Sequence, residues 1–493
     1  MKFTPHKYQM TAIKWLVSHP EAGLLLDPGM GKTSITLASL LQLRRTKAVR
    51  KVLIVCPLRV AYLVWSQMGE IGKWENFKDH FKVSLLHGSH KEDALDEDAD
   101  LYVINYDGLA WLTQPMDATK PRGLRNPSRL DGLIARGVDC LVLDELSKFK
   151  NHGTKRFKTL KGYLPKFRRR WGLTGSPAAN GLLDLFGQAY VLDLGKALGP
   201  YVTHYRYKYF LPCGYMNREW KPSEGAEARI YQALKPLMLS MRATDHLEGM
   251  PSLVEQDVWV DLPAKARTFY DEMEKEMIAE LDGHTVVAGS AGVLSGKCRQ
   301  IASGGLYHDR KDGPPCTEGG FTVQSGVRET LGIHDAKTEA LGDLIEELQG
   351  QPLLVGFEFK HDRARIEGLG VKHFIDGSTS TKETLRLCAD WNAGKISVLC
   401  VHPQAAGHGL NLQGSSCAHV AWYTVPWDYD LYTQTIDRVY RQGNASKTVF
   451  VHRLLARGTV DVAVSRALHG KAKTQDALMD ALKAYTKERR NGR

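Results

Sequence analysis

Several features that define other classes of protein are missing from this sequence. No apolar run reaches the roughly 18–20 residues that a membrane span requires. Residues 1–20 carry His, Lys and Gln where a signal peptide would be apolar. The eight cysteines include no C-x-x-C pair, so neither a disulfide framework nor a zinc ribbon is indicated. We therefore expect a soluble intracellular protein that makes no use of a membrane.

Length and charge are the most informative properties that remain. The chain has 493 residues, of which 43% are hydrophobic and 25% charged, so it is too long for a single hydrophobic core. We expect two or three domains on this basis. Lys and Arg number 66 against 55 Asp and Glu, a formal net charge of +11. This excess favours a polyanionic partner, but weakly, because many basic proteins bind none.

An α/β pattern appears twice along the chain, in residues 20–180 and again in 335–460. Short β-branched runs predict buried parallel strands, and amphipathic helical stretches separate most of them. These runs are Val52–Val55, Leu101–Ile104, Leu141–Leu143, Leu353–Val355, Val398–Val401 and Val449–Val451. Residues 471–493 hold seven Lys or Arg against three Asp or Glu, which suits a solvated helix with a frayed end as well as a DNA-contacting tail.

A glycine-rich loop follows the apolar run Leu24–Leu26 and precedes a helical pattern from Ser34 to Leu43. The loop, Asp27–Thr33, reads D-P-G-M-G-K-T. Glycines let backbone N–H groups close around phosphate oxygens, the lysine supplies charge, and the threonine hydroxyl can ligate Mg²⁺. The strict phosphate-loop pattern fails at its first position, where Leu26 stands. A chance G-K-T is common, but the flanking strand and helix favour a phosphate site.

An acidic pair ends another apolar strand, in the segment L-V-L-D-E of Leu141–Glu145. Acids at the carboxyl edge of a doubly wound sheet face the ligand crevice. Asp144 would then hold Mg²⁺, and Glu145 would orient and deprotonate an attacking water. The pair could instead be surface acids that open the next segment. When the acid pair is considered together with the glycine loop, ATP hydrolysis is the more specific interpretation.

The chain resembles the Swi/Snf-type ATPases of helicase superfamily two, particularly the short versions found in bacteria and phages. In the first half the resemblance rests on Tyr8-Gln9, the loop Asp27–Thr33, Cys56–Arg59 with Trp65, the D-E-A-H-like box Asp144–Asn151, and Leu173–Pro177 with Asn180. In the second half it rests on Arg299–Ile301, Lys337, Leu354–Phe357, Asp376–Ser378, Gly407–Leu412, Trp427 and the Q-x-x-D-R-x-x-R segment within Gln434–Gly443. These motifs are collinear over most of the chain.

The resemblance implies two tandem RecA-like lobes, each a parallel sheet flanked by helices, with helical insertions between them. The domains expected from it are an ATP-binding lobe over 1–240 with a helical protrusion from about 180, a linker and helical insertion over 241–330, a second lobe over 331–470, and a basic tail over 471–493. Hydrolysis would require both lobes, because the loop lies on one and the arginine fingers on the other.

The resemblance also implies roles for individual residues. Catalytic residues would be Lys32, Asp144, Glu145, Gln434, Arg438 and Arg441. ATP would be bound by Tyr8, Gln9, Asp27, Gly29, Gly31, Lys32, Thr33, Ser34 and Gly409, and Mg²⁺ by Thr33 and Asp144. The DNA backbone would contact Arg59, Lys148, Lys150, Asn151, Lys360 and Asn411. Arg438 and Arg441 are three residues apart, which predicts that they share one face of a helix.

One departure from the family pattern bears on coupling. Ser147 replaces the His of the D-E-A-H box, a residue that links the ATP site to nucleic acid, so the coupling would be wired differently, for example through Lys148. The basic and aromatic residues between His204 and Phe210 fit either a stacking surface for nucleic acid or ordinary core packing.

The function expected from the sequence is ATP-driven translocation on double-stranded DNA, with ATP and Mg²⁺ as cofactors. Two alternatives stay open: a strand-separating helicase acting on branched DNA or RNA, and a non-catalytic protein that binds DNA or a polymerase. Expected partners are duplex DNA and proteins of replication, repair or transcription. The expected location is the cytoplasm, on the nucleoid of a bacterial host if a phage encodes the protein.

Overall fold

The computed structural model describes most of the chain. The described residues are 2–67, 69–116, 126–175, 181–213, 219–246, 251–282, 288–309, 316–318, 321–323, 328–406, 410–442 and 444–469. The expectations for Gly409, for the segment 176–180 and for the tail 471–493 fall outside them. None of the described helices combines the length and apolarity that a membrane span requires.

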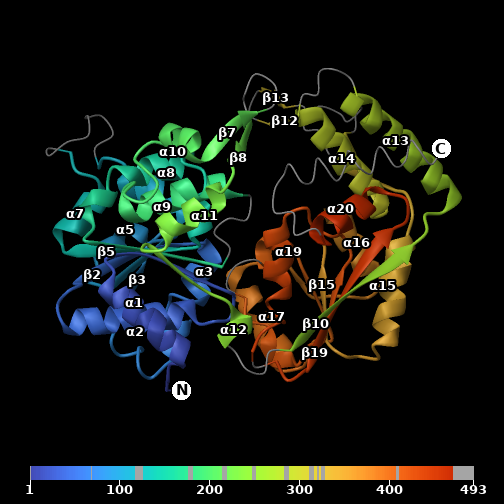
Figure 1. Ribbon diagram of the computed structural model, residues 1–493. Coiled ribbons are helices and arrows are strands. Elements are labelled where there is room, and N and C mark those ends of the chain that lie inside the picture. Colours follow the sequence, from blue (N-terminus) through green and yellow to red (C-terminus); the bar gives the residue numbers. More distant parts are fainter. Residues whose placement is uncertain are drawn as a thin grey trace. The chain divides into compact units, whose positions relative to one another are not determined.

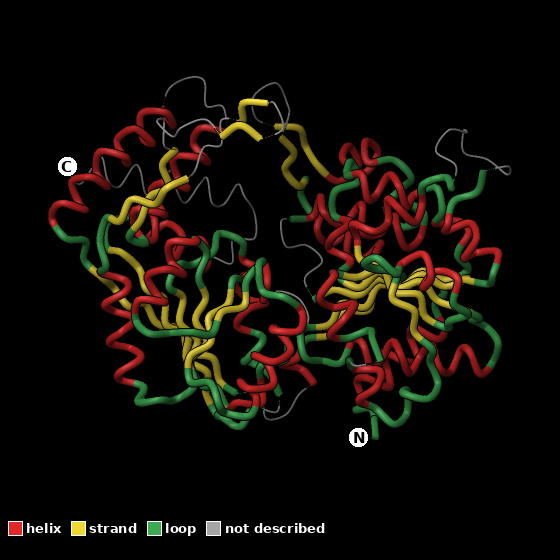
Figure 2. The backbone as a smooth tube through the Cα atoms, turned by 180° about the vertical axis from the view of Figure 1, so that it is seen from behind, coloured by secondary structure: helices red, strands yellow, loops and turns green. Residues whose placement is uncertain are grey.

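Two units make up the chain, and each is built around its own parallel sheet (Figures 1 and 2). The first comprises Met1–Glu248 with His408–Leu410, and the second comprises Gly249–Gly407 with Asn411–Arg493. We refer to them as unit 1 and unit 2. The α/β class predicted from the sequence, two tandem RecA-like lobes, is confirmed.

The sheet of unit 1 has seven parallel strands in the order β3-β4-β2-β5-β6-β1-β9, and helices cover both of its faces (Figure 2). Such strands are buried on both faces, which explains their continuous apolar runs. The strands are β1 (Glu21–Leu26), β2 (Lys51–Cys56), β3 (Val83–Leu85), β4 (Leu101–Asn105), β5 (Val138–Asp144), β6 (Arg169–Thr174) and β9 (Met238–Met241). Because all run in one direction, the carboxyl ends of the neighbours β5, β6 and β1 meet at one edge.

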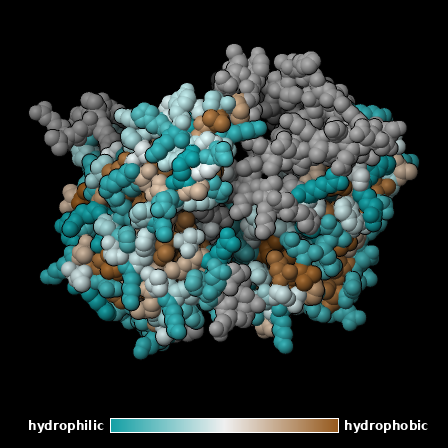
Figure 3. All heavy atoms as spheres, viewed as in Figure 1, coloured by the Kyte–Doolittle hydropathy of each residue, from teal (hydrophilic) through white to brown (hydrophobic). Residues whose placement is uncertain are grey.

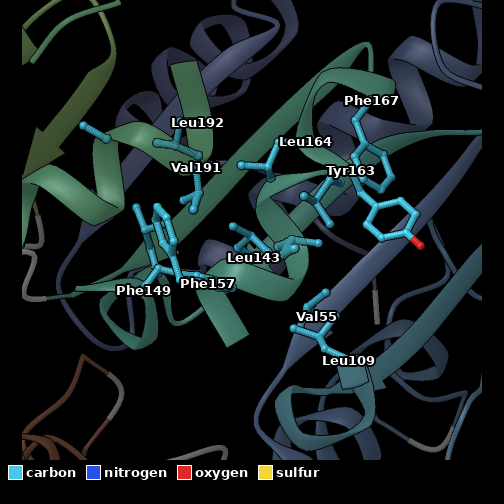
Figure 4. Close-up of a cluster of buried hydrophobic side chains, with 14 of the residues drawn as sticks. Val55, Leu109, Leu143, Phe149, Phe157, Tyr163, Leu164, Phe167, Val191 and Leu192 are labelled. Carbon is cyan, nitrogen blue, oxygen red and sulfur yellow. The ribbon is translucent and has the colours of Figure 1, made fainter. Parts of the chain in front are cut away.

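The helices of unit 1 are α1 (Lys7–Ser18), α2 (Lys32–Arg45), α3 (Leu58–Leu63), α4 (Glu70–Lys73), α5 (Lys91–Asp96), α6 (Leu109–Thr113), α7 (Arg129–Ala135), α8 (Lys155–Lys161), α9 (Leu185–Asp193), α10 (Val202–Tyr209), α11 (Ala226–Leu234) and α12 (Ala243–His246). Helices α5 to α11 pack a large apolar core against this sheet (Figure 4). A hairpin of β7 (Phe210–Cys213) and β8 (Glu219–Pro222) follows α10. On α10, Tyr205 and Tyr209 are buried in the core whereas Tyr207 is exposed, so the aromatic segment divides between packing and surface.

The sheet of unit 2 has six parallel strands in the order β10-β19-β18-β15-β17-β16. Its strands are β10 (Ser252–Val260), β15 (Leu353–Gly356), β16 (Phe374–Ile375), β17 (Val398–Val401), β18 (His419–Trp422) and β19 (Thr448–Ala456). The sequence predicts a linker and helical insertion over 241–330, yet β10 within it pairs with β19 along nine residues. The strand reads S-L-V-E-Q-D-V-W-V, and its first five residues are exposed at the edge of the sheet.

The remaining elements of unit 2 are mostly helices. They are α13 (Ala264–Asp282), α14 (Ala288–Ala302), α15 (Ala336–Glu347), α16 (Lys360–Gly368), α17 (Thr381–Asn392), α18 (Pro403–Ala406), α19 (Tyr429–Ile436) and α20 (Val460–His469). Two short antiparallel ladders pair β11 (Gly305–Asp309) with β14 (Arg328–Gly332) and β12 (Cys316–Glu318) with β13 (Phe321–Val323). The long helices α13 and α14 both lie within residues 241–330.

Candidate active site

The glycine loop joins β1 to α2, as the sequence predicts. Gly29 and Gly31 have φ values of 85° and 79°, a backbone conformation that residues with a Cβ atom adopt only with strain. A Cβ atom on Gly31 would also lie 2.6 Å from the side-chain amide nitrogen of Gln9. The loop therefore needs glycine at this position for two reasons, and it leads into the positive end of the fourteen-residue helix α2.

Lys32 is the first residue of α2, and its ammonium group folds onto the loop. Its Nζ donates to the carbonyl oxygens of Leu26, at 2.6 Å, and of Asp27, at 3.4 Å. Thr33 and Ser34 follow in the first turn, with Ser34 buried. Loop, lysine and hydroxyl groups thus gather at the carboxyl end of β1, an arrangement that suits a polyphosphate.

Tyr8 and Gln9 brace the loop from α1. The Tyr8 hydroxyl and the Gln9 amide both donate to the carbonyl oxygen of Met30, at 3.0 and 3.2 Å. Both side chains are buried. The structure therefore brings these predicted ATP-binding residues together with the loop itself.

Asp27 and Tyr8 also contact α12, a connection that sequence reasoning missed. One carboxylate oxygen of Asp27 accepts a hydrogen bond of 2.8 Å from the backbone N–H of Ala243. The Tyr8 ring stacks on His246 with 5.7 Å between ring centroids. The loop is thereby linked to the segment that follows β9, more than two hundred residues along the chain.

Asp144 ends β5 and receives a hydrogen bond from a residue far away in sequence. The indole N–H of the fully buried Trp65 donates to its carboxylate at 2.7 Å. The pKa of Asp144 is raised to about 6, mainly by burial, with the Trp65 hydrogen bond and the Lys32 ammonium lowering it and the charge of Glu145 raising it. A metal ion beside this carboxylate would offset the cost of burying its charge. The surroundings of Asp144 thus fit a Mg²⁺ ligand.

Glu145 adopts a left-handed backbone conformation with φ of 71°. Such strain in a residue other than glycine costs on the order of 1–3 kcal/mol and concentrates at functional sites. Its N–H donates to Leu173 at 2.9 Å, and its carboxylate oxygen accepts hydrogen bonds from the hydroxyl groups of Ser147 and, at 3.0 Å, Thr174. Ser147, which stands where the family has His, therefore orients Glu145 directly.

Tyr106 holds the backbone of the acidic pair through hydrogen bonds. Its buried hydroxyl donates to the carbonyl oxygens of Asp144 and, at 3.1 Å, Glu145. The Arg156 guanidinium lies over the Tyr106 ring, 5.5 Å from its centroid. The sequence offers no local signal for this role, because Tyr106 precedes Asp144 by 38 residues.

Among the predicted catalytic residues of unit 2, only Gln434 lies in a helix, and the two arginines come after that helix has ended. Gln434 lies in α19, but the helix ends at Ile436, so Arg438 and Arg441 stand on the turns after it, and the predicted helical placement is wrong. The Nε atom of Arg438 donates to the Gln434 carbonyl at 3.0 Å, and that of Arg441 to the Asp437 carbonyl at 2.7 Å. The buried Gln434 amide oxygen has no hydrogen-bond partner among the described residues, an arrangement that a bound group would satisfy.

Arg299, which belongs to one of the motifs shared with the family, is buried in unit 2. It pairs with the Glu358 carboxylate and donates to the Val425 carbonyl at 2.8 Å. Its guanidinium also lies 5.0 Å from the ring centroid of Trp427. Lys337, fully buried, pairs with Asp461 at 2.7 Å. The contacts of Arg299 link α14 to the segments that follow β15 and β18, and the Lys337–Asp461 pair links α15 to α20.

The predicted DNA-binding residues are distributed over both units. Lys148 lies in the short 3-10 helix Leu146–Phe149, and Lys150 and Asn151 follow it, so these three share one segment. Arg59 lies in α3, while Lys360 begins α16 and Asn411 follows in a loop. Asn151, Lys360 and Asn411 are exposed, as contact with a large ligand requires.

Unit 1 has a glycine loop and an acid pair at one edge of its sheet. Unit 2 is a second parallel α/β unit with a glutamine in α19 and two arginines after that helix. Together these features are the arrangement of a helicase-like ATPase. Residues 8–300 match the family model described as SNF2-related domain, and residues 336–443 match the Helicase conserved C-terminal domain. The chain belongs to the SNF2-related family. The enzyme class expected from the sequence, a helicase-like ATPase that depends on DNA, is confirmed by these two matches.

Relatives of different length share this core. Protein p41 of the Acyrthosiphon pisum secondary endosymbiont phage 1 is 33% identical over 98% of this chain and 99% of its own. The uncharacterized ATP-dependent helicase MG018 of Mycoplasma genitalium is 24% identical over 94% of this chain but only 41% of its own length. The mouse DNA annealing helicase and endonuclease ZRANB3 is 26% identical over 72% of this chain and 31% of its own. This chain thus spans less than half of these two relatives.

Among solved structures, the Sulfolobus solfataricus SWI2/SNF2 ATPase core in complex with dsDNA is similar to this chain. The match covers 97% of this chain and 94% of that one, at 21% identity and a TM-score of 0.40.

Proposed function

We propose that this protein is an ATP-dependent translocase on double-stranded DNA, which hydrolyses ATP to move along DNA or to remodel DNA–protein complexes. One observation carries the ATPase part of this proposal. The glycine loop, Thr174 and the pair Asp144–Glu145 follow three neighbouring parallel strands, β1, β6 and β5, and so meet at one edge of the unit 1 sheet. Family membership and the net charge of +11 support DNA as the partner.

In this proposal the residues divide the chemistry as follows. Lys32 compensates phosphate charge, Glu145 orients the attacking water and accepts its proton, and Gln434, Arg438 and Arg441 of unit 2 stabilise the transferring phosphoryl group. ATP is held by Tyr8, Gln9, Asp27, Gly29, Gly31, Lys32, Thr33, Ser34 and Gly409. Thr33 and Asp144 would hold Mg²⁺, which supplies further charge compensation when bound. Because these groups belong to both units, turnover requires both.

The DNA contacts proposed are those to the backbone, through Arg59, Lys148, Lys150, Asn151, Lys360 and Asn411. Backbone contacts carry little sequence preference, which suits a motor that moves along DNA. We also propose the organisation into an ATP-binding lobe over 1–240, an insertion over 241–330, a second lobe over 331–470 and a basic tail over 471–493. We further propose that the protein acts on the nucleoid, together with proteins of replication, repair or transcription.

Strand separation is a second candidate function, because two relatives carry helicase in their names. A fluorescent unwinding assay on forked duplexes distinguishes it from translocation without strand separation. A non-catalytic role is disfavoured, since Lys32, Asp144, Glu145, Arg438 and Arg441 are all present.

The proposal is tested by ATP turnover measured at low salt with duplex DNA, single-stranded DNA or RNA. We expect duplex DNA to stimulate turnover most and the Glu145→Gln variant to abolish it in every case. Turnover that duplex DNA leaves unchanged would contradict the proposal, and a Glu145→Gln variant that keeps full biological activity would revive the non-catalytic role.

A further inference from the structure

A long stretch of unit 1 contains cations but no acid. Between Glu145 and Asp184 the sequence has ten Lys or Arg and neither Asp nor Glu. The ten are Lys148, Lys150, Lys155, Arg156, Lys158, Lys161, Lys166, Arg168, Arg169 and Arg170. The rest of the chain therefore carries nearly equal numbers of the two charges. Most of the net charge of this protein is concentrated in a single stretch of the chain.

Several of these cations are already engaged by the fold. Lys166 pairs with Asp131 at 2.5 Å, and Arg170 pairs with Glu21 at 2.5 Å. Arg169 donates to the Val17 carbonyl at 3.2 Å. These interactions neutralise or fix the cations at the C-terminal end of the stretch. The charged surface of the stretch is therefore formed by α8 and the segment before it.

The seven-residue helix α8 separates apolar and charged side chains cleanly. Phe157 and Leu160 are buried in the core of unit 1, where Figure 4 shows Phe157 among its apolar neighbours. Lys155, Lys158 and Lys161, at intervals of three residues, are exposed. None of the three forms an ion pair with any residue that the structure describes, although Lys161 lies 4.9 Å from the Tyr190 ring centroid.

A second helix adds positive charge beside α8. Burial lowers the pKa of His152, and the charges of Arg206 on α10 and of Lys158 and Lys161 on α8 lower it further. These cations therefore lie close enough to act on one imidazole. Figure 3 shows hydrophilic side chains over the part of unit 1 where Figure 1 labels α8 and α10.

We propose that Lys155, Lys158 and Lys161 form a further DNA contact surface, here named the α8 surface, which binds the phosphate backbone of duplex DNA. It would extend the contacts of Lys148, Lys150 and Asn151 along the same segment, and it rests on the proposed function. Positive charges that lie close together with no acid between them repel each other. A bound polyanion relieves this electrostatic repulsion. Duplex DNA supplies one negative charge per roughly 1.7 Å of its axis.

The test is the salt dependence of duplex binding by the full chain, measured by fluorescence anisotropy between low and physiological salt. Each phosphate contact contributes about 0.9 to the slope of log K against log salt. We expect Lys155→Gln/Lys158→Gln/Lys161→Gln to reduce the magnitude of that slope by about two to three. The triple Arg variant at the same positions should keep the wild-type slope, because it keeps the charge.

A matched control separates this surface from net charge in general. Lys14 in α1, Lys265 in α13 and Lys372 in the loop before β16 are exposed, and replacing them by Gln removes the same charge. An equal reduction in both triple variants, or none in the α8 variant, would overturn the α8 surface. Absence of salt-dependent duplex binding in the wild type would instead overturn the proposed function. Circular dichroism and thermal midpoints establish that each variant is folded.

Discussion

At the scale of single residues, the acid pair of the candidate active site is oriented by groups that come from elsewhere in the chain. Trp65 donates to Asp144, and the hydroxyl groups of Ser147 and Thr174 converge on one oxygen of Glu145. Hydrogen bonds to a charged group contribute about 1.5–3 kcal/mol, more than those between neutral groups. These donors therefore fix where the two carboxylates point.

Removing the Ser147 hydroxyl tests this orientation. We expect Ser147→Ala to lower kcat for DNA-stimulated ATP hydrolysis about tenfold, with KM for ATP nearly unchanged, because about 1.4 kcal/mol of transition-state stabilisation corresponds to tenfold. Ser147→Thr keeps the hydroxyl and should stay within about twofold of wild type. Equal rates in the Ala and Thr variants would show that the hydroxyl does not position Glu145.

The indole of Trp65 offers a second test, directed at the metal. Trp65→Phe preserves an aromatic ring but removes the N–H, so we expect the Mg²⁺ concentration for half-maximal turnover to rise about tenfold or more. Trp171 is equally buried but donates to the His19 carbonyl, so Trp171→Phe is the matched control. A similar Mg²⁺ response in both variants would remove Trp65 from this role.

Residue types within motifs were predictable from the sequence, and contacts between distant residues were not. The loop Asp27–Thr33 and the pair Asp144–Glu145 each have a local pattern that the chemistry demands, and the structure places them at one sheet edge. The bond from Trp65 to Asp144 spans 79 residues, and that from Asp27 to Ala243 spans 216. Nothing local in the chain distinguishes these partners from other tryptophans and backbone amides.

At the scale of secondary-structure elements, burial decides what the sequence reveals. Strands buried on both faces, such as β2 and β15, appear as continuous apolar runs and were predicted. The first five residues of the edge strand β10 are exposed, and the strand lies within 241–330, where the family resemblance implies a linker and helical insertion. The turns after α19 carry Arg438 and Arg441 because the helix ends at Ile436, a boundary that the spacing of arginines does not reveal.

The start of α15 carries a pH-dependent element. The buried His334 donates from Nε2 to the Ile301 carbonyl at 2.8 Å and accepts at Nδ1 from the Ala336 N–H at 3.3 Å. Burial lowers the pKa of His334 to about 4. Since Nδ1 accepts a hydrogen bond, protonation there breaks it.

This folded-state pKa predicts the direction of acid sensitivity. As pH falls from about 6.5 towards 4, the unfolded chain binds a proton that the folded chain refuses, so His334 costs up to about 1.4 kcal/mol of stability per pH unit. Above about 6.5 this effect is absent. We expect His334→Asn, which retains an acceptor, to lose less stability than wild type between pH 7 and pH 5, measured by urea unfolding of the full chain. Equal losses would contradict this origin of the pH dependence.

At the scale of the whole molecule, the structure shows how the length is divided into units and where along the chain the net charge lies. The length corresponds to two α/β units, as expected, and the charge excess of +11 is concentrated in one stretch of unit 1. A motor that grips backbone phosphates without a sequence code needs such cations. The division of the expected catalytic groups between both units means that neither unit alone should hydrolyse ATP.

The central claim is that ATP hydrolysis drives movement along duplex DNA, and displacement of a third strand reports it directly. A duplex carrying a short fluorescent triplex-forming strand is incubated with the full chain, ATP and Mg²⁺. We predict ATP-dependent release of the third strand by wild type, none by Glu145→Gln, and no separation of the duplex beneath. ATP turnover stimulated by DNA without any release of the third strand would contradict translocation.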